Sequence, residues 1–165
     1  MPHDHNRDWS DAPHWPEVAA AQNKLRGFVA ENRLAVLLDL HNPAPWDTRA
    51  YFVGFSGTNR SSAAGAAQIK FLDAAYAEVT GPLHLENRRP ASELERSLFS
   101  ANAAPYRSRS CVPWVRANGN SNSVAFTLET PWNLPDSTST GYRALGRQLG
   151  LAIERYLHDS EGATK

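Results

Sequence analysis

The sequence predicts an α/β protein with a layered sheet that is mixed but mostly parallel and is flanked by helices. Three observations support this prediction: apolar runs typical of buried strands, segments with apolar residues at helical spacing, and the alternation of the two along the chain. With 165 residues, of which 41% are hydrophobic, the chain is long enough for one domain with a substantial core. We therefore expect residues 1–165 to form a single domain.

The first helix and the first strand are predicted from residues 16–40. Pro16 suits a first helical position. The residues after it form one apolar stripe at helical spacing: Val18, Ala21, Leu25, Phe28 and Val29. Residues 34–40, "LAVLLDL", contain almost no polar side chain, which predicts a strand that is buried on both faces in the interior of a sheet.

Two more elements are expected before residue 80. Residues 51–55, "YFVGF", are a short strand candidate. Ser61 or Ser62 can cap a helix that runs to about Val79. In "SELE", Ser92 has the spacing of a capping box and predicts another short helix.

The last third of the chain is predicted to hold a strand and a long helix. A turn-rich stretch is expected to end in the exposed residues 118–123, "NGNSNS". Residues 124–129 alternate, with Val124, Phe126 and Leu128 on one face and the intervening residues on the other. Residues 141–157 have one apolar stripe typical of a helix: Tyr142, Leu145, Leu149, Ile153 and Tyr156.

Three strands are few for this number of helices. A buried strand at residues 34–40 needs hydrogen-bonding neighbours on both edges, so part of the sheet is expected to be missing. An exposed sheet edge then favours self-association.

The composition excludes several classes of partner. Lys and Arg number 17 and Asp and Glu 17, so charge gives no reason to expect nucleic acid or membrane partners. The sequence has neither an apolar run of bilayer length nor a signal-peptide core, so we expect a soluble chain with the cytoplasm as its default compartment. Any export signal would lie upstream of Met1, which leaves the compartment open. The single cysteine, Cys111, forms no internal disulfide and is predicted to be a packed thiol.

Four residues are candidates for chemistry. His41 directly follows an apolar strand, where α/β proteins tend to gather ligands, and it is a candidate metal ligand. Glu129 ends another strand and is a candidate general base. Asn6 and Arg7 offer an amide and a guanidinium fork that suit a carboxylate. Taken singly, each residue fits a structural or solvated role better.

Three segments together resemble a known family. "DHNRDW", "LLDLHNP" and "VAFTLET", in this order, resemble signature segments of the zinc carboxypeptidases, the family of carboxypeptidase A and its bacterial relatives. The final helix is also similar to the closing helix of that family. The resemblance covers nearly the whole chain but only the later part of a family catalytic domain, which implies an incomplete zinc-carboxypeptidase-like (phosphorylase/hydrolase-like) fold.

The resemblance implies a role for each candidate residue. Asn6 and Arg7 would hold the free C-terminal carboxylate of a peptide or similar substrate, His41 would be the last of three ligands to one zinc ion, and Glu129 would activate the zinc-bound water. Tyr106 is the nearest candidate for the mobile tyrosine that closes over substrate in the family. Asp39 has the strand parity of His41 and is a candidate supporting residue.

The first two zinc ligands of the family come from an H-x-x-E motif upstream of the Asn-Arg pair, so we expect the ligand set to be incomplete here. "HWPE", residues 14–17, has those letters but follows the pair, and we interpret it as a coincidence. His3 and His5 form an H-x-H pair with no strand before it, which is a still weaker metal signal.

Three functional readings stay open. The first is the C-terminal part of a zinc-dependent metallocarboxypeptidase that is inactive in isolation. The second is a truncated or degenerate relative without enzymatic activity that binds carboxylate-ended ligands. The third is an amide hydrolase of the same family that acts on non-peptide or peptidoglycan substrates.

Overall fold

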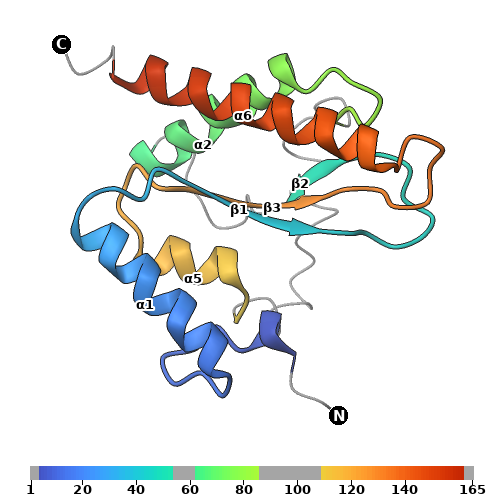
Figure 1. Cartoon of the computed structure of the whole chain (residues 1–165). Coiled ribbons are helices and arrows are strands. Elements are labelled where there is room, and N and C mark those ends of the chain that lie inside the picture. Colours follow the sequence, from blue (N-terminus) through green and yellow to red (C-terminus); the bar gives the residue numbers. More distant parts are fainter. Residues whose placement is uncertain (1–3, 54–61, 86–108, 162–165) are drawn as a thin grey trace.

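The computed structural model describes residues 4–53, 62–85 and 109–161. A sheet lies in the middle of three layers (Figure 1). It contains β1 (Val36–His41), β2 (Tyr51–Val53) and β3 (Val124–Glu129) in the order β1-β3-β2. β1 pairs with β3 in parallel and β2 pairs with β3 antiparallel. The predicted mixed α/β class is confirmed.

Helices cover both faces of this sheet within the described residues. α2 (Ala63–Glu78) and α6 (Ser139–Glu161) lie on one face, and α1 (Pro16–Ala30) and α5 (Cys111–Asn118) lie on the other (Figure 1). No described helix combines the length and the apolar character needed to cross a bilayer.

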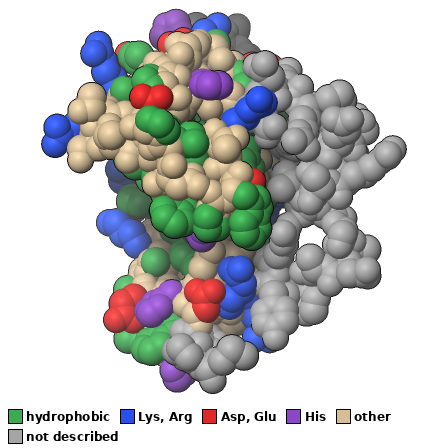
Figure 2. Space-filling view, turned by 90° about the vertical axis from the view of Figure 1, so that its right-hand side faces the viewer, with side chains coloured by type: hydrophobic (Ala, Val, Ile, Leu, Met, Phe, Trp, Pro, Cys, Tyr) green, Lys and Arg blue, Asp and Glu red, His purple; other side chains and the backbone are tan. Residues whose placement is uncertain are grey.

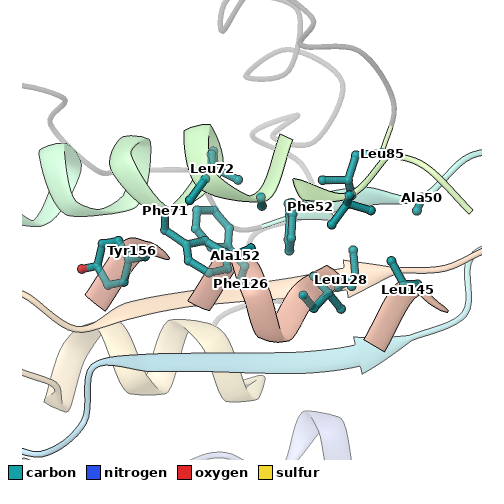
Figure 3. Close-up of a cluster of buried hydrophobic side chains, with 14 of the residues drawn as sticks. Ala50, Phe52, Phe71, Leu72, Leu85, Phe126, Leu128, Leu145, Ala152 and Tyr156 are labelled. Atoms are coloured by element: carbon teal, nitrogen blue, oxygen red, sulfur yellow. The ribbon is translucent and has the colours of Figure 1, made fainter. Parts of the chain in front are cut away.

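The main core lies between the sheet and the helices α2 and α6 (Figure 3). Phe126 of β3 is at its centre. Its ring centroid is 5.5 Å from that of Phe52 and 5.9 Å from that of Phe71. The predicted stripe of the last helix packs against this cluster, so α6 is held by the burial of that stripe.

Local sequence signals set the helix boundaries where they were expected. Pro16 occupies the first turn of α1. The Ser62 hydroxyl accepts a hydrogen bond from the amide of Gly65 at 3.1 Å and caps α2. Beyond the end of α1, Asn32 has a φ of 53°, a left-handed conformation that asparagine tolerates better than most residues.

The interior position predicted for residues 34–40 is wrong for the described sheet. β3 is the central strand and is buried on both faces, whereas β1 lies at an edge and Leu40 is 67% exposed. An apolar run in the sequence predicts that both faces of a strand are covered. It does not predict which strands lie on either side of it in the sheet, so it does not distinguish an edge strand from a central one.

The turn-rich stretch predicted before residues 118–123 is also wrong in part, because α5 occupies Cys111–Asn118. Pro113 indicates a turn when the sequence is read alone, but proline is tolerated in the first turn of a helix, and Pro113 is the third residue of α5. Burial of Val112, Trp114 and Val115 against α1 and the sheet stabilises the helix. Residues 54–55, Ser61, the predicted helix at Ser92, and Tyr106 lie outside the described residues.

Candidate functional site

The candidate site lies at the carboxyl ends of β1 and β3, on the face covered by α1 and α5. Leu37 of β1 packs into the α1–α5 cluster, whereas Val36 and Leu38 face the main core. Side chains alternate along a strand, so Asp39 and His41 share the face of Leu37.

The register of β1 and β3 brings Glu129 to this face. His41 is the partner of Glu129 and Asp39 is the partner of Thr127. Side chains of paired residues point to the same side of a sheet. In agreement, the Thr127 hydroxyl lies 3.5 Å from Asp39 Oδ2.

A short helical turn places Asn6 over the end of β1. This turn, η1 (His5–Arg7), is capped by Asp4, whose Oδ1 accepts a hydrogen bond from the backbone N–H of Asn6 at 2.8 Å. Asn6 Nδ2 lies 3.2 Å from His41 Nε2, and Asn6 Oδ1 lies 3.5 Å from the amide nitrogen of Cys111. Asn6 thus bridges β1 and the start of α5.

A buried aspartate fixes the segment between η1 and α1. Asp8 is 4% exposed and accepts hydrogen bonds from the amides of His14 at 2.9 Å and Trp15 at 2.7 Å. Gln22 of α1 donates to Ser10 O at 3.0 Å. Sequence reasoning missed this support, because one aspartate in a polar segment does not reveal which amides it accepts from.

His41 Nε2 has two close polar neighbours. It lies 3.0 Å from Asp39 Oδ1 as well as 3.2 Å from Asn6 Nδ2. A protonated Nε2 donates to the carboxylate, and an unprotonated Nε2 accepts from the amide. In the tautomer that carries the proton on Nε2, Asp39 orients the imidazole. Its position beside His41 is the one that strand parity indicated.

Glu129 is half-buried, and its Oε2 is buried with no hydrogen-bond partner within the described residues. Burial raises the pKa of this carboxyl above its usual value, and the nearby carboxylates Asp39 and Asp47 raise it further, while His41 acts in the opposite direction. A carboxylate with a raised pKa and an unpartnered oxygen is suited to accepting a proton from a bound molecule.

Arg7 follows Asn6 in η1, but its side chain is not among those that line the cavity next to Asn6. Its Nη1 donates to the carbonyl oxygen of Asn6 at 2.8 Å, and the side chain is half-buried. The predicted pair is therefore adjacent in space, with the amide turned toward His41 and the guanidinium turned to the backbone. The other N–H groups of the guanidinium can still be offered to a carboxylate.

A cavity of about 280 Å³ opens next to these residues. Its lining combines polar groups with the apolar side of α1: His5, Asn6, Trp9, Glu17, Val18, Ala21, Asp39, His41 and Cys111. Cys111 is 8% exposed, and burial, helped by Asp39, raises the pKa of its thiol to about 12. Cys111 is thus the packed thiol that the sequence predicted.

Each of the two weaker metal motifs contributes one residue, His5 or Glu17, to the lining of the cavity that His41 also lines. His5 Nε2 lies 3.9 Å from Glu17 Oε2. The His14 ring packs edge-on against Trp15. His3 lies outside the described residues.

The described residues do not fit a catalytic zinc ion by themselves. Within residues 4–53, 62–85 and 109–161, no three His, Cys, Asp or Glu side chains are grouped so as to hold a metal ion. His41 contributes one nitrogen, and a catalytic zinc takes three protein ligands. The donor set present is therefore smaller than zinc requires.

Comparisons of this chain with protein-family models, with curated proteins and with solved structures found no match.

Proposed function

We propose that Asn6, Arg7, His41 and Glu129 belong to a zinc-dependent metallocarboxypeptidase-type site that acts on peptides or other amides ending in a free carboxylate. The proposal includes the finer fold, in which β1, β2 and β3 are part of a zinc-carboxypeptidase-like sheet. One observation carries it: Asn6, His41 and Glu129, distant in the sequence, converge at the carboxyl ends of two parallel strands.

Each of these residues has a task that its surroundings support. Arg7, with its remaining N–H groups, binds the carboxylate of the ligand through charge-assisted hydrogen bonds. Glu129 Oε2, which is buried beside His41, takes a proton from water or from the ligand. His41, oriented by Asp39, supplies one metal-binding nitrogen.

Hydrolysis within this proposal requires zinc ligands in addition to His41. We therefore expect residues 1–165 alone to bind carboxylate-ended ligands without appreciable release of C-terminal residues. Robust zinc-dependent release by this chain would contradict the incomplete ligand set.

Ligand binding without hydrolysis is the second candidate function. It needs no metal ligand beyond His41, and the convergence of Asn6, His41 and Glu129 at the strand ends supports it equally. The two functions share the carboxylate ligand and differ in whether added zinc produces turnover.

The proposal is tested by calorimetric titration of the chain with an acetylated dipeptide and with the same dipeptide as its C-terminal amide. We expect the free carboxylate to bind and Arg7→Gln to weaken that binding about tenfold to hundredfold, because a charged hydrogen bond is lost. Arg33→Gln is the matched control, because Arg33 is exposed and pairs with Glu31 at 2.8 Å. Equal affinity for the acid and the amide would overturn the proposal.

A further inference from the structure

The end of α5 places an exposed asparagine directly before a glycine. Asn118 is the last residue of α5, and Gly119 is its C-cap. In an Asn-Gly pair the backbone nitrogen of the glycine can attack the side-chain carbonyl carbon of the asparagine, because glycine has no Cβ to hinder the approach. The pair is therefore a candidate site for a covalent modification.

The packing of the loop after α5 requires glycine at this position. A Cβ atom at residue 119 would lie 2.6 Å from Val115 O, which is closer than Cβ atoms come, and 3.1 Å from Ser123 Cβ. The φ of Gly119 is −80°, so lack of space and not backbone conformation excludes a side chain. The fold itself thus places the least hindered type of backbone nitrogen next to Asn118.

Two hydrogen bonds within α5 keep the reacting groups apart. Asn118 Nδ2 donates to Trp114 O at 2.8 Å, which draws the carboxamide back along the helix. Gly119 N donates to Val115 O at 2.6 Å. The nitrogen must lose its proton before it attacks, and a hydrogen bond to a carbonyl opposes that loss. The folded last turn of α5 therefore suppresses the reaction.

The last turn of α5 is the part of this helix that can open without disrupting the core. Trp114 and Val115 are buried, whereas the helix end is exposed, and helix ends open at a lower free energy than buried elements. Beyond the turn, Asn120 Nδ2 donates to Val29 O at 3.2 Å and to Asn32 Oδ1 at 2.9 Å. These bonds fasten the loop to the end of α1 and limit the opening.

We propose that Asn118 is a deamidation site that is closed while the last turn of α5 is formed and reacts when this turn opens. Gly119 N loses its proton to solvent and bonds to Asn118 Cγ, the Cγ–Nδ2 bond breaks, and Nδ2 takes up a proton and leaves as ammonia. Water then hydrolyses the resulting five-membered succinimide ring, which leaves aspartate or isoaspartate at position 118. The inference does not depend on the proposed function.

The modified residue no longer closes the turn. A carboxylate cannot donate to Trp114 O, and a negative charge at the carboxyl end of a helix opposes the helix dipole. The product therefore favours the open turn. The other end of α5 carries Cys111, whose amide nitrogen lies beside Asn6. Figure 2 looks onto that end of the molecule, where β1 and β3 finish, so Gly119 lies on the side away from this view.

The test follows position 118 of the full chain by peptide mapping with mass spectrometry during incubation at mildly alkaline pH. We expect deamidation in concentrated guanidinium, and a rate about tenfold to a hundredfold lower in the folded chain, because the reaction there waits for local opening. Asn122, which is exposed and precedes a serine, is the internal reference and should react more slowly than Asn118 in guanidinium. Equal rates at Asn118 in the folded and unfolded chain, or no reaction there in guanidinium, would overturn the proposal.

A second measurement distinguishes opening of the turn from global unfolding. Low concentrations of urea should leave the rate in the folded chain nearly unchanged, because opening one turn exposes little surface. A rate that rises as steeply with urea as global unfolding does would overturn the proposal.

Variants of the loop complete the test. Asn120→Ala should raise the folded-state rate about twofold to tenfold, the range for the loss of a hydrogen bond, and the matched control Asn122→Ala should not change it. Asn118→Asp should lower the urea midpoint of unfolding, and Asn122→Asp should not. An unchanged rate in Asn120→Ala would show that the loop does not limit the opening, and an unchanged midpoint in Asn118→Asp would show that the product closes the turn as well as asparagine does. Either result would overturn the proposal.

Discussion

His41 and Glu129 occupy paired positions at the last residues of two parallel strands, β1 and β3. The amide of Thr130 donates to the carbonyl of His41 at 2.9 Å and closes this end of the pair. The relative position of the two side chains is therefore set by the strand register. A shift of one residue in register would turn Glu129 toward the opposite face, so the strand pairing itself defines the site.

The buried carboxyl of Glu129 makes stability depend on pH. Its raised folded-state pKa means that the unfolded chain ionises first as the pH rises, so this group lowers the free energy of unfolding above about pH 4. Glu129→Gln removes this cost. Urea unfolding should show the variant to be more stable than the unmodified chain at neutral pH, with the difference disappearing near the ordinary glutamate pKa.

Glu154→Gln is the control for that comparison, since Glu154 is exposed on α6. If Glu129→Gln were less stable at neutral pH, the Glu129 carboxylate would have stabilising partners in the folded protein, whereas its buried Oε2 has none among the described residues.

Asp8 is expected to control the position of η1. Asp8→Ala leaves the amides of His14 and Trp15 without their acceptor, which should lower the free energy of unfolding by about 1–3 kcal/mol. Chemical denaturation measures this loss. The exposed neighbour Asp11, changed to alanine, should alter stability by no more than about 0.5 kcal/mol. Equal effects of the two substitutions would show that the hydrogen bonds of Asp8 do not stabilise the segment between η1 and α1.

The Cys111 thiol should be unreactive in the folded chain. Because burial raises its pKa to about 12, the thiolate fraction near pH 8 is on the order of a thousandfold smaller than for an ordinary cysteine. Labelling with iodoacetamide should be slow in the native protein and fast in concentrated guanidinium, as followed by mass spectrometry. Rapid stoichiometric labelling of the folded chain would mean that Cys111 is not buried in the cluster between α1, α5 and the sheet.

Phe126 should contribute strongly to stability, because it joins the ring cluster of the main core. Phe126→Ala should lower the free energy of unfolding by about 3–5 kcal/mol, since it removes a fully buried ring between Phe52 and Phe71. Thermal and urea unfolding measure the loss. Leu157→Ala, at an exposed position of α6, should change stability little, and a comparable loss there would contradict the assigned core.

The sequence predicted the elements that have local signals. The proline at the start of α1, the serine cap of α2, the alternation in β3 and the apolar stripe of α6 are each carried by neighbouring residues, so each could be found without knowing the fold. In contrast, α5 depends on the burial of its tryptophan and valines against other elements, and its proline indicates a turn when read alone.

The site was predicted in part for the same reason. Strand parity placed Asp39 on the face of His41, because the period of a strand is regular. The grouping of Glu129 with His41 came from the resemblance, since nothing local in the sequence shows that β1 pairs with β3. The contact of Asn6 with His41 depends on how η1 folds back, and no local pattern encodes it. The carboxylate-binding role of Arg7 and the zinc ion came from the resemblance and remain proposals.

The most direct test of the site is the ¹⁵N NMR signal of His41 Nε2 during titration with an acetylated dipeptide and with its C-terminal amide. His41→Gln assigns the resonance, and His158, exposed on α6, serves as the internal reference. We predict that the free carboxylate shifts the His41 signal, that the amide shifts it far less, and that His158 is unaffected. Binding of the dipeptide without any change at His41 would contradict the assignment of Asn6, His41 and Glu129 to one site.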